Sequence, residues 1–211
     1  MGVSLSTARY IAPISFAIDF AAQQYGMLST PNMKDVHDAN LSFWSPQPFF
    51  IAGFFFPQQL FQLAWLWRLW RSNDQSALED GAVNTMVDFS PFYTVGNLCI
   101  ASWMVFWNAS DLKTSNIFVV INSLAQLYYI FGRLPPMNLN STNSVLTHIV
   151  SKTFAGIGIL DLLHNGSVAY FVHQQPSTAV KVLTGTASIV ASKNLWRPPY
   201  IRSPKSDYRA L

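Results

Sequence analysis

Residues 89–110, FSPFYTVGNLCIASWMVFWNAS, contain no charged side chain. A helix of this length can span a lipid bilayer, because about 20 apolar residues cross the hydrocarbon core and the lipid offers the backbone no hydrogen-bond partner. Two further stretches of the chain lack charge, and two others carry a single aspartate each. Together these stretches predict five membrane-spanning helices, at about 9–27, 47–69, 90–108, 115–133 and 147–173.

The composition of the whole chain indicates the same class of protein. Of its 211 residues, 50% are hydrophobic, 15% aromatic and only 11% charged, whereas soluble domains carry about 25% charged residues. The aromatic content excludes intrinsic disorder, and the single cysteine, Cys99, excludes a disulfide-stabilised secreted domain. The composition is not that of a nucleic-acid-binding protein either. We predict an all-α, polytopic membrane bundle of five to six transmembrane helices over 1–195, followed by a basic tail with Pro and Arg at 196–211.

A sixth segment, 179–191, is less apolar, because it contains Lys181 and several small polar residues. The distribution of basic residues nevertheless favours it as a membrane span. Cytoplasmic ends of membrane proteins are enriched in Lys and Arg, and only a sixth crossing places the basic C-terminal tail on the same side as Arg9 and Arg133. We therefore favour six spans, with five as the alternative.

Two carboxylic acids fall in the middle of predicted spans. Ionisable side chains at membrane depth are costly, so each is a candidate functional group. Asp19 shares a helical face with Gln23, and Asp161 shares one with His164 and Asn165. If the protein is an enzyme, Asp19, Asp161 and His164 are the candidate catalytic residues, because a buried neutral carboxyl group can act as a general acid. The alternative is that they fix the packing of the helices.

Side-chain amides are also frequent in the predicted spans. In the second span, Pro57 precedes two of them and frees a backbone carbonyl, and Gly53 would let another backbone approach there. Such amides either line a polar groove or hold helices together by hydrogen bonds. The candidate ligand-binding residues are Gln58, Gln62, Asn97, Trp103, Trp107, Asn122 and Gln126. The histidines lack metal-ligand spacing, so no metal or other cofactor is predicted.

Tryptophan and tyrosine side chains gather near the ends of the predicted spans. A ring with a polar edge suits the headgroup region of a bilayer, so we expect most of them to face that region. The alternative is an aromatic pocket for a flat or apolar ligand. The residues concerned are Trp44, Trp65, Trp67, Trp70, Tyr93, Trp107, Tyr128, Tyr129 and Trp196. Asn40, in the sequence Asn-Leu-Ser, would be the candidate glycosylation site of a eukaryotic protein.

Part of the chain resembles the tryptophan-rich TspO/MBR proteins. The residues that carry the resemblance are SPQP at 45–48, FP at 56–57, WLW at 65–67 and YTVGNLCIASWMVFW at 93–107. It covers about residues 45–130, and the Trp-x-Pro-Pro element of the family is absent at the start of the second span. The resemblance implies a five-helix bundle, often dimeric, that binds porphyrins or sterols in a central aromatic pocket. It also implies that Asn97, Trp103 and Trp107 are pocket residues.

Three functions are compatible with these features. The first is binding or transport of a small hydrophobic ligand, sterol-, porphyrin- or terpenoid-like, in an aromatic and amide-lined pocket within the bundle. The second is a membrane-embedded cyclase or isomerase, which would require Asp19 and Asp161 to meet at one cavity. The third is a non-catalytic accessory subunit. The expected partners are the lipid bilayer, the hydrophobic ligand and a second copy of the chain, with no nucleic acid. The endoplasmic reticulum and the mitochondrial membrane both stay open as locations.

Overall fold

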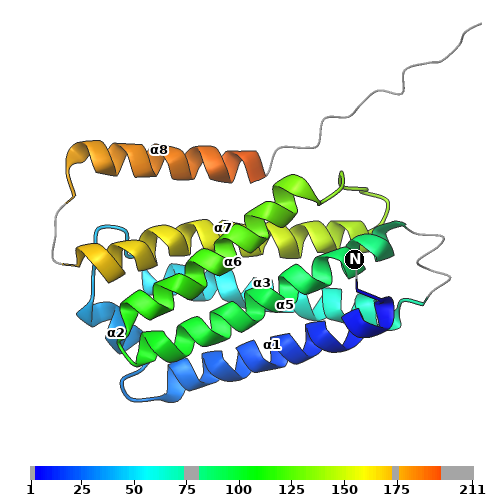
Figure 1. Ribbon diagram of the computed structural model, residues 1–211, viewed down its shortest axis with the longest axis horizontal. Coiled ribbons are helices and arrows are strands. Elements are labelled where there is room, and N and C mark those ends of the chain that lie inside the picture. Colours follow the sequence, from blue (N-terminus) through cyan, green and yellow to red (C-terminus); the bar gives the residue numbers. More distant parts are fainter. Residues whose placement is uncertain (1–2, 74–80, 173–175, 196–211) are drawn as a thin grey trace, which may run out of the picture.

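The computed structural model describes residues 3–73, 81–172 and 176–195 and is all-helical over these residues, which confirms the all-α part of the predicted fold class. The predicted tail at 196–211 lies outside the described residues. Figure 1 labels the helices: α1 (Leu5–Leu28), α2 (Met33–Ala39), α3 (Pro48–Arg71), α5 (Gly81–Asn108), α6 (Leu112–Gly132), α7 (Thr142–Phe171) and α8 (Thr178–Leu195).

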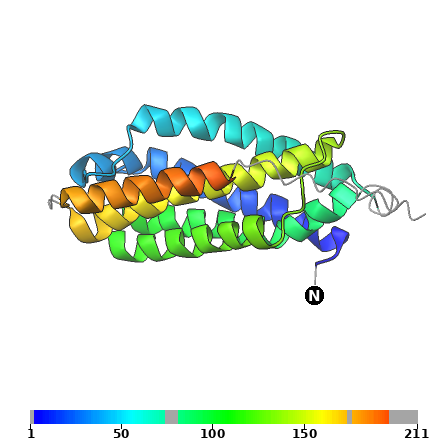
Figure 2. The ribbon, with the colours of Figure 1, turned by 90° about the horizontal axis from the view of Figure 1, so that it is seen from above.

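The six long helices lie roughly parallel to one long axis and alternate in direction (Figures 1 and 2). Helix α5 is central, because it packs against α1, α6 and α7, while α8 packs on α7. The short helix α2 closes one end of the bundle, which we call the α2 end. The opposite end carries Arg68, Arg71 and Arg133, and we call it the arginine end.

The helices begin where side chains satisfy free backbone N–H groups. Ser4 Oγ accepts a hydrogen bond from the Thr7 N–H at 3.1 Å at the start of α1, and Asp111 Oδ1 accepts one from the Thr114 N–H at 3.2 Å at the start of α6. Such caps stabilise a helix end because the first turn has no carbonyl partners within the helix. Pro48 is the first residue of α3, where its missing N–H has no cost.

Two segments differ from the sequence-based expectation. Helix α2 occupies what looked like a polar connection, since Asn32 and Asp35 form a reciprocal capping box that starts a short helix there. Helix α5 begins at Gly81 rather than near residue 90, so it extends beyond the charge-free stretch. The expectation for Gly53 was wrong, because a Cβ added to it would meet no atom of the described residues within 4 Å.

The bundle buries many polar side chains and exposes many large apolar ones, which is not the distribution of a protein in water. Polar side chains such as Gln62, Asn97 and Gln126 are buried in the bundle, while Phe56, Leu124 and many other large apolar residues face outwards. Water would oppose so much exposed apolar surface, whereas lipid accepts it. Within the described residues, three helices are long and apolar enough to cross a membrane, namely α3, α6 and α7. The chain is therefore a membrane-associated helical protein.

The aromatic core lies where α3, α5, α6 and α7 meet. The distance between ring centroids is 4.9 Å for Trp65 and Tyr93 and 4.8 Å for Phe89 and Tyr129. It is 5.5 Å for Tyr93 and Phe154. All five side chains are buried, so Trp65, Tyr93 and Tyr129 face the bundle interior rather than the lipid. The position of a residue near the end of a span determines how deep its ring lies in the bilayer. It does not determine whether the ring faces the lipid or the bundle interior.

Candidate functional site

The first cluster of predicted site residues lies between α1, α3 and α5. Tyr93 Oη donates a hydrogen bond to Gln62 Oε1 at 2.8 Å, and Asn97 Nδ2 donates one to the Tyr93 carbonyl at 2.9 Å. Gln23 Nε2 donates to Asp19 Oδ1 at 3.3 Å, and the Asp19 carboxyl group is close enough to Tyr93 for an electrostatic interaction. The Tyr93–Gln62 hydrogen bond thus joins α5 to α3, whereas the Gln23–Asp19 hydrogen bond lies within α1.

The predicted amides on α6 hold that helix against α5. Gln126 Nε2 donates a hydrogen bond to the Phe92 carbonyl at 2.9 Å and lies 3.4 Å from Asn122 Oδ1. A Cβ added to Gly96 would be 2.7 Å from Gln126 Nε2 and 3.1 Å from Asn122 Oδ1. These atoms are in close contact, so the two amides serve as helix-to-helix contacts in this structure. Gln58, the remaining predicted amide, is buried one turn before Gln62 on α3.

A second cluster lies at the α2 end, where α2 covers α5 and α7. Trp103 Nε1 donates a hydrogen bond to Asn165 Oδ1 at 2.7 Å. The His164 ring is 5.5 Å from the Trp107 ring and 5.2 Å from the His37 ring, between ring centroids. Trp103, Trp107 and His164 are thus brought together, as the sequence alone could not show, and His37 from α2 completes the group.

The charge state of the α2 end follows from burial. Burial lowers the pKa of the His37 imidazole, the adjacent Asp38 carboxylate opposes this shift, and the Lys34 ammonium adds to it. His37 is therefore neutral at pH 7. Lys34 is exposed and pairs with Asp38, which raises the pKa of Lys34. The neutral His37 ring therefore packs against the His164 ring, which in turn contacts the Trp107 ring.

The two mid-helix carboxyl groups have different surroundings. Asp19 is on α1, which packs mainly on α5, whereas Asp161 is on α7 on the other side of α5 (Figure 1). Asp19 contacts Gln23, while the backbone carbonyl of Asp161 accepts a hydrogen bond from Asn165 Nδ2 at 3.1 Å. A cyclase would need both carboxyl groups at one cavity, and neither residue is among those that line the groove described next.

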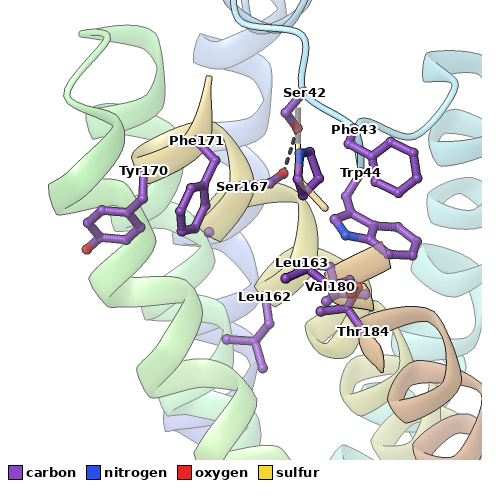
Figure 3. Close-up of a pocket in the computed structure, with 12 residues that line it drawn as sticks. Ser42, Phe43, Trp44, Leu162, Leu163, Ser167, Tyr170, Phe171, Val180 and Thr184 are labelled. Atoms are coloured by element: carbon purple, nitrogen blue, oxygen red, sulfur yellow. Dashed lines mark hydrogen bonds between the residues drawn. The ribbon is translucent and has the colours of Figure 1, made fainter. Parts of the chain in front are cut away.

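A groove with a volume of about 420 Å³ opens beside α7 at the α2 end (Figure 3). Leu162 and Leu163 of α7 line the part of the groove that is further from the C-terminal end of this helix. Its walls come from three segments that are distant in the sequence: Phe43 and Trp44 before α3, Tyr170 and Phe171 at the end of α7, and Val180 and Thr184 of α8. The surface is mainly aromatic and aliphatic, which suits a hydrophobic ligand.

Few polar groups interrupt this apolar surface. The Ser42 and Ser167 hydroxyl groups share a hydrogen bond of 2.6 Å that joins the segment before α3 to α7 (Figure 3). Lys181 Nζ lies 4.4 Å from the centre of the Phe43 ring, at the edge of the groove. Among the described residues, the groove therefore has a mainly apolar lining, and the Lys181 ammonium group lies beside one of its lining rings, that of Phe43.

None of the predicted ligand-binding residues lines this groove. Sequence reasoning missed it because its walls meet only in the folded chain, and Trp44 was assigned to the headgroup region. One signal was available on α8. Its polar residues recur every three or four positions, at Lys181, Thr184 and Ser188, which marks a helical face turned towards the rest of the protein.

Comparisons of the chain with known protein families, with curated proteins and with solved structures found no match. The resemblance to the TspO/MBR proteins stays a prediction.

Proposed function

We propose that the chain is a membrane protein with six spans that binds a small hydrophobic ligand in the groove between α7, α8 and the segment before α3. The groove itself carries this proposal. Its volume of about 420 Å³ falls within the range of roughly 300–1,000 Å³ for small-molecule sites. Its aromatic and aliphatic lining favours an apolar molecule. The site thus lies at the surface of the bundle rather than among the central amides.

The arrangement of charges supports a bundle that crosses the membrane repeatedly. Arg68 and Arg71 are in the last turn of α3, and Arg133 caps the end of α6. Lys34 is in α2 and Lys113 is in the first turn of α6, and Figure 1 shows α2 and the start of α6 at the opposite end of the bundle. Asp88 neutralises part of the first group by its ion pair with Arg133. Because cytoplasmic ends are enriched in basic residues, we assign the arginine end to the cytoplasm.

The side chains of α8 support its inclusion as the sixth span. This helix turns Lys181, Thr184 and Ser188 towards the bundle and exposes Leu183 and Ile189. A helix on a water-covered surface would show the opposite pattern. Its 18 residues give a length of about 27 Å at 1.5 Å per residue, close to the hydrocarbon thickness of about 30 Å.

Cysteine labelling from one side of the membrane tests the number of spans. On a Cys99→Ala background, single cysteines would replace Lys113, Asn140 or Asn194, all of which are exposed. With six spans, Asn194→Cys reacts with a membrane-impermeant maleimide from the same side as Asn140→Cys and opposite to Lys113→Cys. With five, Asn194→Cys reacts together with Lys113→Cys. Labelling after detergent solubilisation, when both sides of the membrane are accessible, shows that each introduced cysteine can react with the maleimide.

Photolabelling tests the proposed ligand site. We expect a hexadecanol with a terminal diazirine, added to the protein in nanodiscs of zwitterionic lipid, to label the groove and unlabelled hexadecanol to compete. The variant Leu163→Trp would fill the groove and reduce the competable labelling about tenfold, the effect of losing about 1.4 kcal/mol of binding. Leu124→Trp is the matched control, since Leu124 of α6 faces outwards. Labelling that is neither competable nor changed by Leu163→Trp would contradict the proposal.

A further inference from the structure

Lys181 lies at the edge of the proposed ligand groove. Its neighbours in the sequence and on the helix, Val180 and Thr184, line the groove, and its ammonium group lies over the ring of Phe43, which also lines it. The side chain is half-buried. The ammonium group is therefore within reach of a ligand whose apolar part fills the groove.

Lys181 also lacks a carboxylate partner within the described part of the chain. The salt bridges found there join Lys34 to Asp38 and Arg133 to Asp88, and neither involves Lys181. Its contact with the Phe43 ring is a cation–π interaction, which compensates only part of the cost of removing an ammonium group from water. An anionic group at the edge of the groove would neutralise this charge.

The hydroxyl groups of the groove already have partners within the protein. Ser167 Oγ donates a hydrogen bond to the His164 carbonyl at 2.8 Å, and Thr184 Oγ1 donates one to the Val180 carbonyl at 2.7 Å. The Ser42 hydroxyl shares its hydrogen bond with Ser167. These hydroxyls therefore have no donor left for an anionic head group, which needs hydrogen-bond donors, whereas Lys181 supplies donors and a positive charge.

We propose that the groove binds a single-chain lipid with a carboxylate head group, such as a long-chain fatty acid. The carboxylate pairs with Lys181 Nζ, and the hydrocarbon chain lies along Leu162 and Leu163 between α7 and α8. This inference rests on the function proposed above. A phosphate head group fits less well, because phosphates are bound by several donors or by the paired donors of arginine, and among the described residues beside the groove the cationic donor is one lysine.

The depth of the groove in the bilayer agrees with this placement. Lys181 is in the first turn of α8, which starts at Thr178 at the α2 end. Leu163 lies eight residues before the end of α7 at Phe171, which corresponds to about 12 Å along the helix. If α7 and α8 span the membrane, the carboxylate lies at the surface of the bilayer and the chain points towards its centre.

Competition with the diazirine probe tests the head group. At pH 9, palmitate should displace the probe about tenfold more effectively than hexadecanol, which has the same chain length without the charge; a charge-assisted hydrogen bond contributes this much. In Lys181→Met, palmitate should displace the probe only as effectively as hexadecanol does, and the displacement by hexadecanol should be unchanged. Lys181→Arg should retain the preference for palmitate. Lys113→Met, an exposed lysine at the same end, is the matched control.

The possible outcomes separate the two proposals. If palmitate and hexadecanol compete equally in the wild-type protein, the carboxylate inference is overturned and the hydrophobic site stands. If neither competes, the proposed function itself fails. If dipalmitoyl phosphatidic acid displaces the probe better than palmitate, the site takes a phosphate-bearing lipid and the inference is wrong. Unchanged hexadecanol competition in Lys181→Met shows that this variant is folded.

Discussion

Replacing Trp65 by alanine should lower the free energy of unfolding by about 3–5 kcal/mol, the range observed when a large aromatic side chain is removed from a protein core. Trp65 is fully buried. Its ring contacts Phe89 and Tyr93, at centroid distances of 5.5 and 4.9 Å, and its Nε1 donates a hydrogen bond to Thr147 Oγ1 at 3.0 Å. In lipid the loss comes from packing and from the hydrogen bond rather than from transfer to water.

Two further variants make the Trp65 prediction specific. Trp65→Phe keeps an aromatic ring and loses the hydrogen bond to Thr147, so it should cost less than the alanine variant. Trp67→Ala is the matched control, because Trp67 is 61% exposed on the outer face of the same helix; it should cost less than about 1 kcal/mol. Unfolding by a denaturing detergent in mixed micelles measures all three. Equal losses for Trp65→Ala and Trp67→Ala would show that Trp65 is not a core residue.

The helices themselves were largely predictable from the spacing of charges. A long stretch without charge has one stable structure in lipid, because only a helix satisfies the backbone within a single segment. The sequence also predicted that Asp19 and Gln23 share a face, and their hydrogen bond confirms this. Helix α2 was missed because its stability comes from the capping side chains of Asn32 and Asp35, a local effect that a search for apolar stretches does not detect.

The lateral neighbours of each helix could not be predicted in the same way. Helical periodicity shows that Asn122 and Gln126 share a face of α6. It does not show that this face meets the Phe92 carbonyl and Gly96 of the neighbouring helix α5. The amides were therefore assigned to a ligand pocket, whereas in the structure they make hydrogen bonds in and between helices. Contacts of this kind depend on which helices are neighbours in the bundle. No local pattern in a single sequence shows which helices these are.

The groove was unpredictable for the same reason. Ser42 and Ser167 share a hydrogen bond although they are 125 positions apart. Its apolar residues resemble those of any lipid-facing surface, so composition does not distinguish Leu163 in the groove from Leu124 on the outside. Lys181 was noticed in the sequence only as an argument against a sixth span. In the structure it becomes the charged edge of the groove.

Replacing Gly158 by leucine should separate α6 from α7. A Cβ at this position would lie 3.0 Å from Ser123 Oγ and 3.5 Å from Ser123 Cα, and Ser123 Oγ donates a hydrogen bond to the Gly158 carbonyl at 2.9 Å. The further atoms of leucine would extend towards the α6 backbone, which cannot move aside as a flexible side chain does. We expect a loss of about 3 kcal/mol in the free energy of unfolding, at the upper end of the usual cost of overpacking.

Gly156 provides the matched control for this variant, because it is on the same helix and a Cβ added to it would meet no atom within 4 Å. Gly156→Leu should therefore leave stability unchanged or raise it by up to about 1 kcal/mol, since leucine has the higher helix propensity. Gly158→Ala adds only the Cβ, so its loss in the free energy of unfolding should lie between those of the wild-type protein and Gly158→Leu. The same mixed-micelle unfolding measures the series. Similar stabilities for the two leucine variants would mean that α6 and α7 do not approach each other closely at Gly158, and the packing order of the bundle would have to be revised.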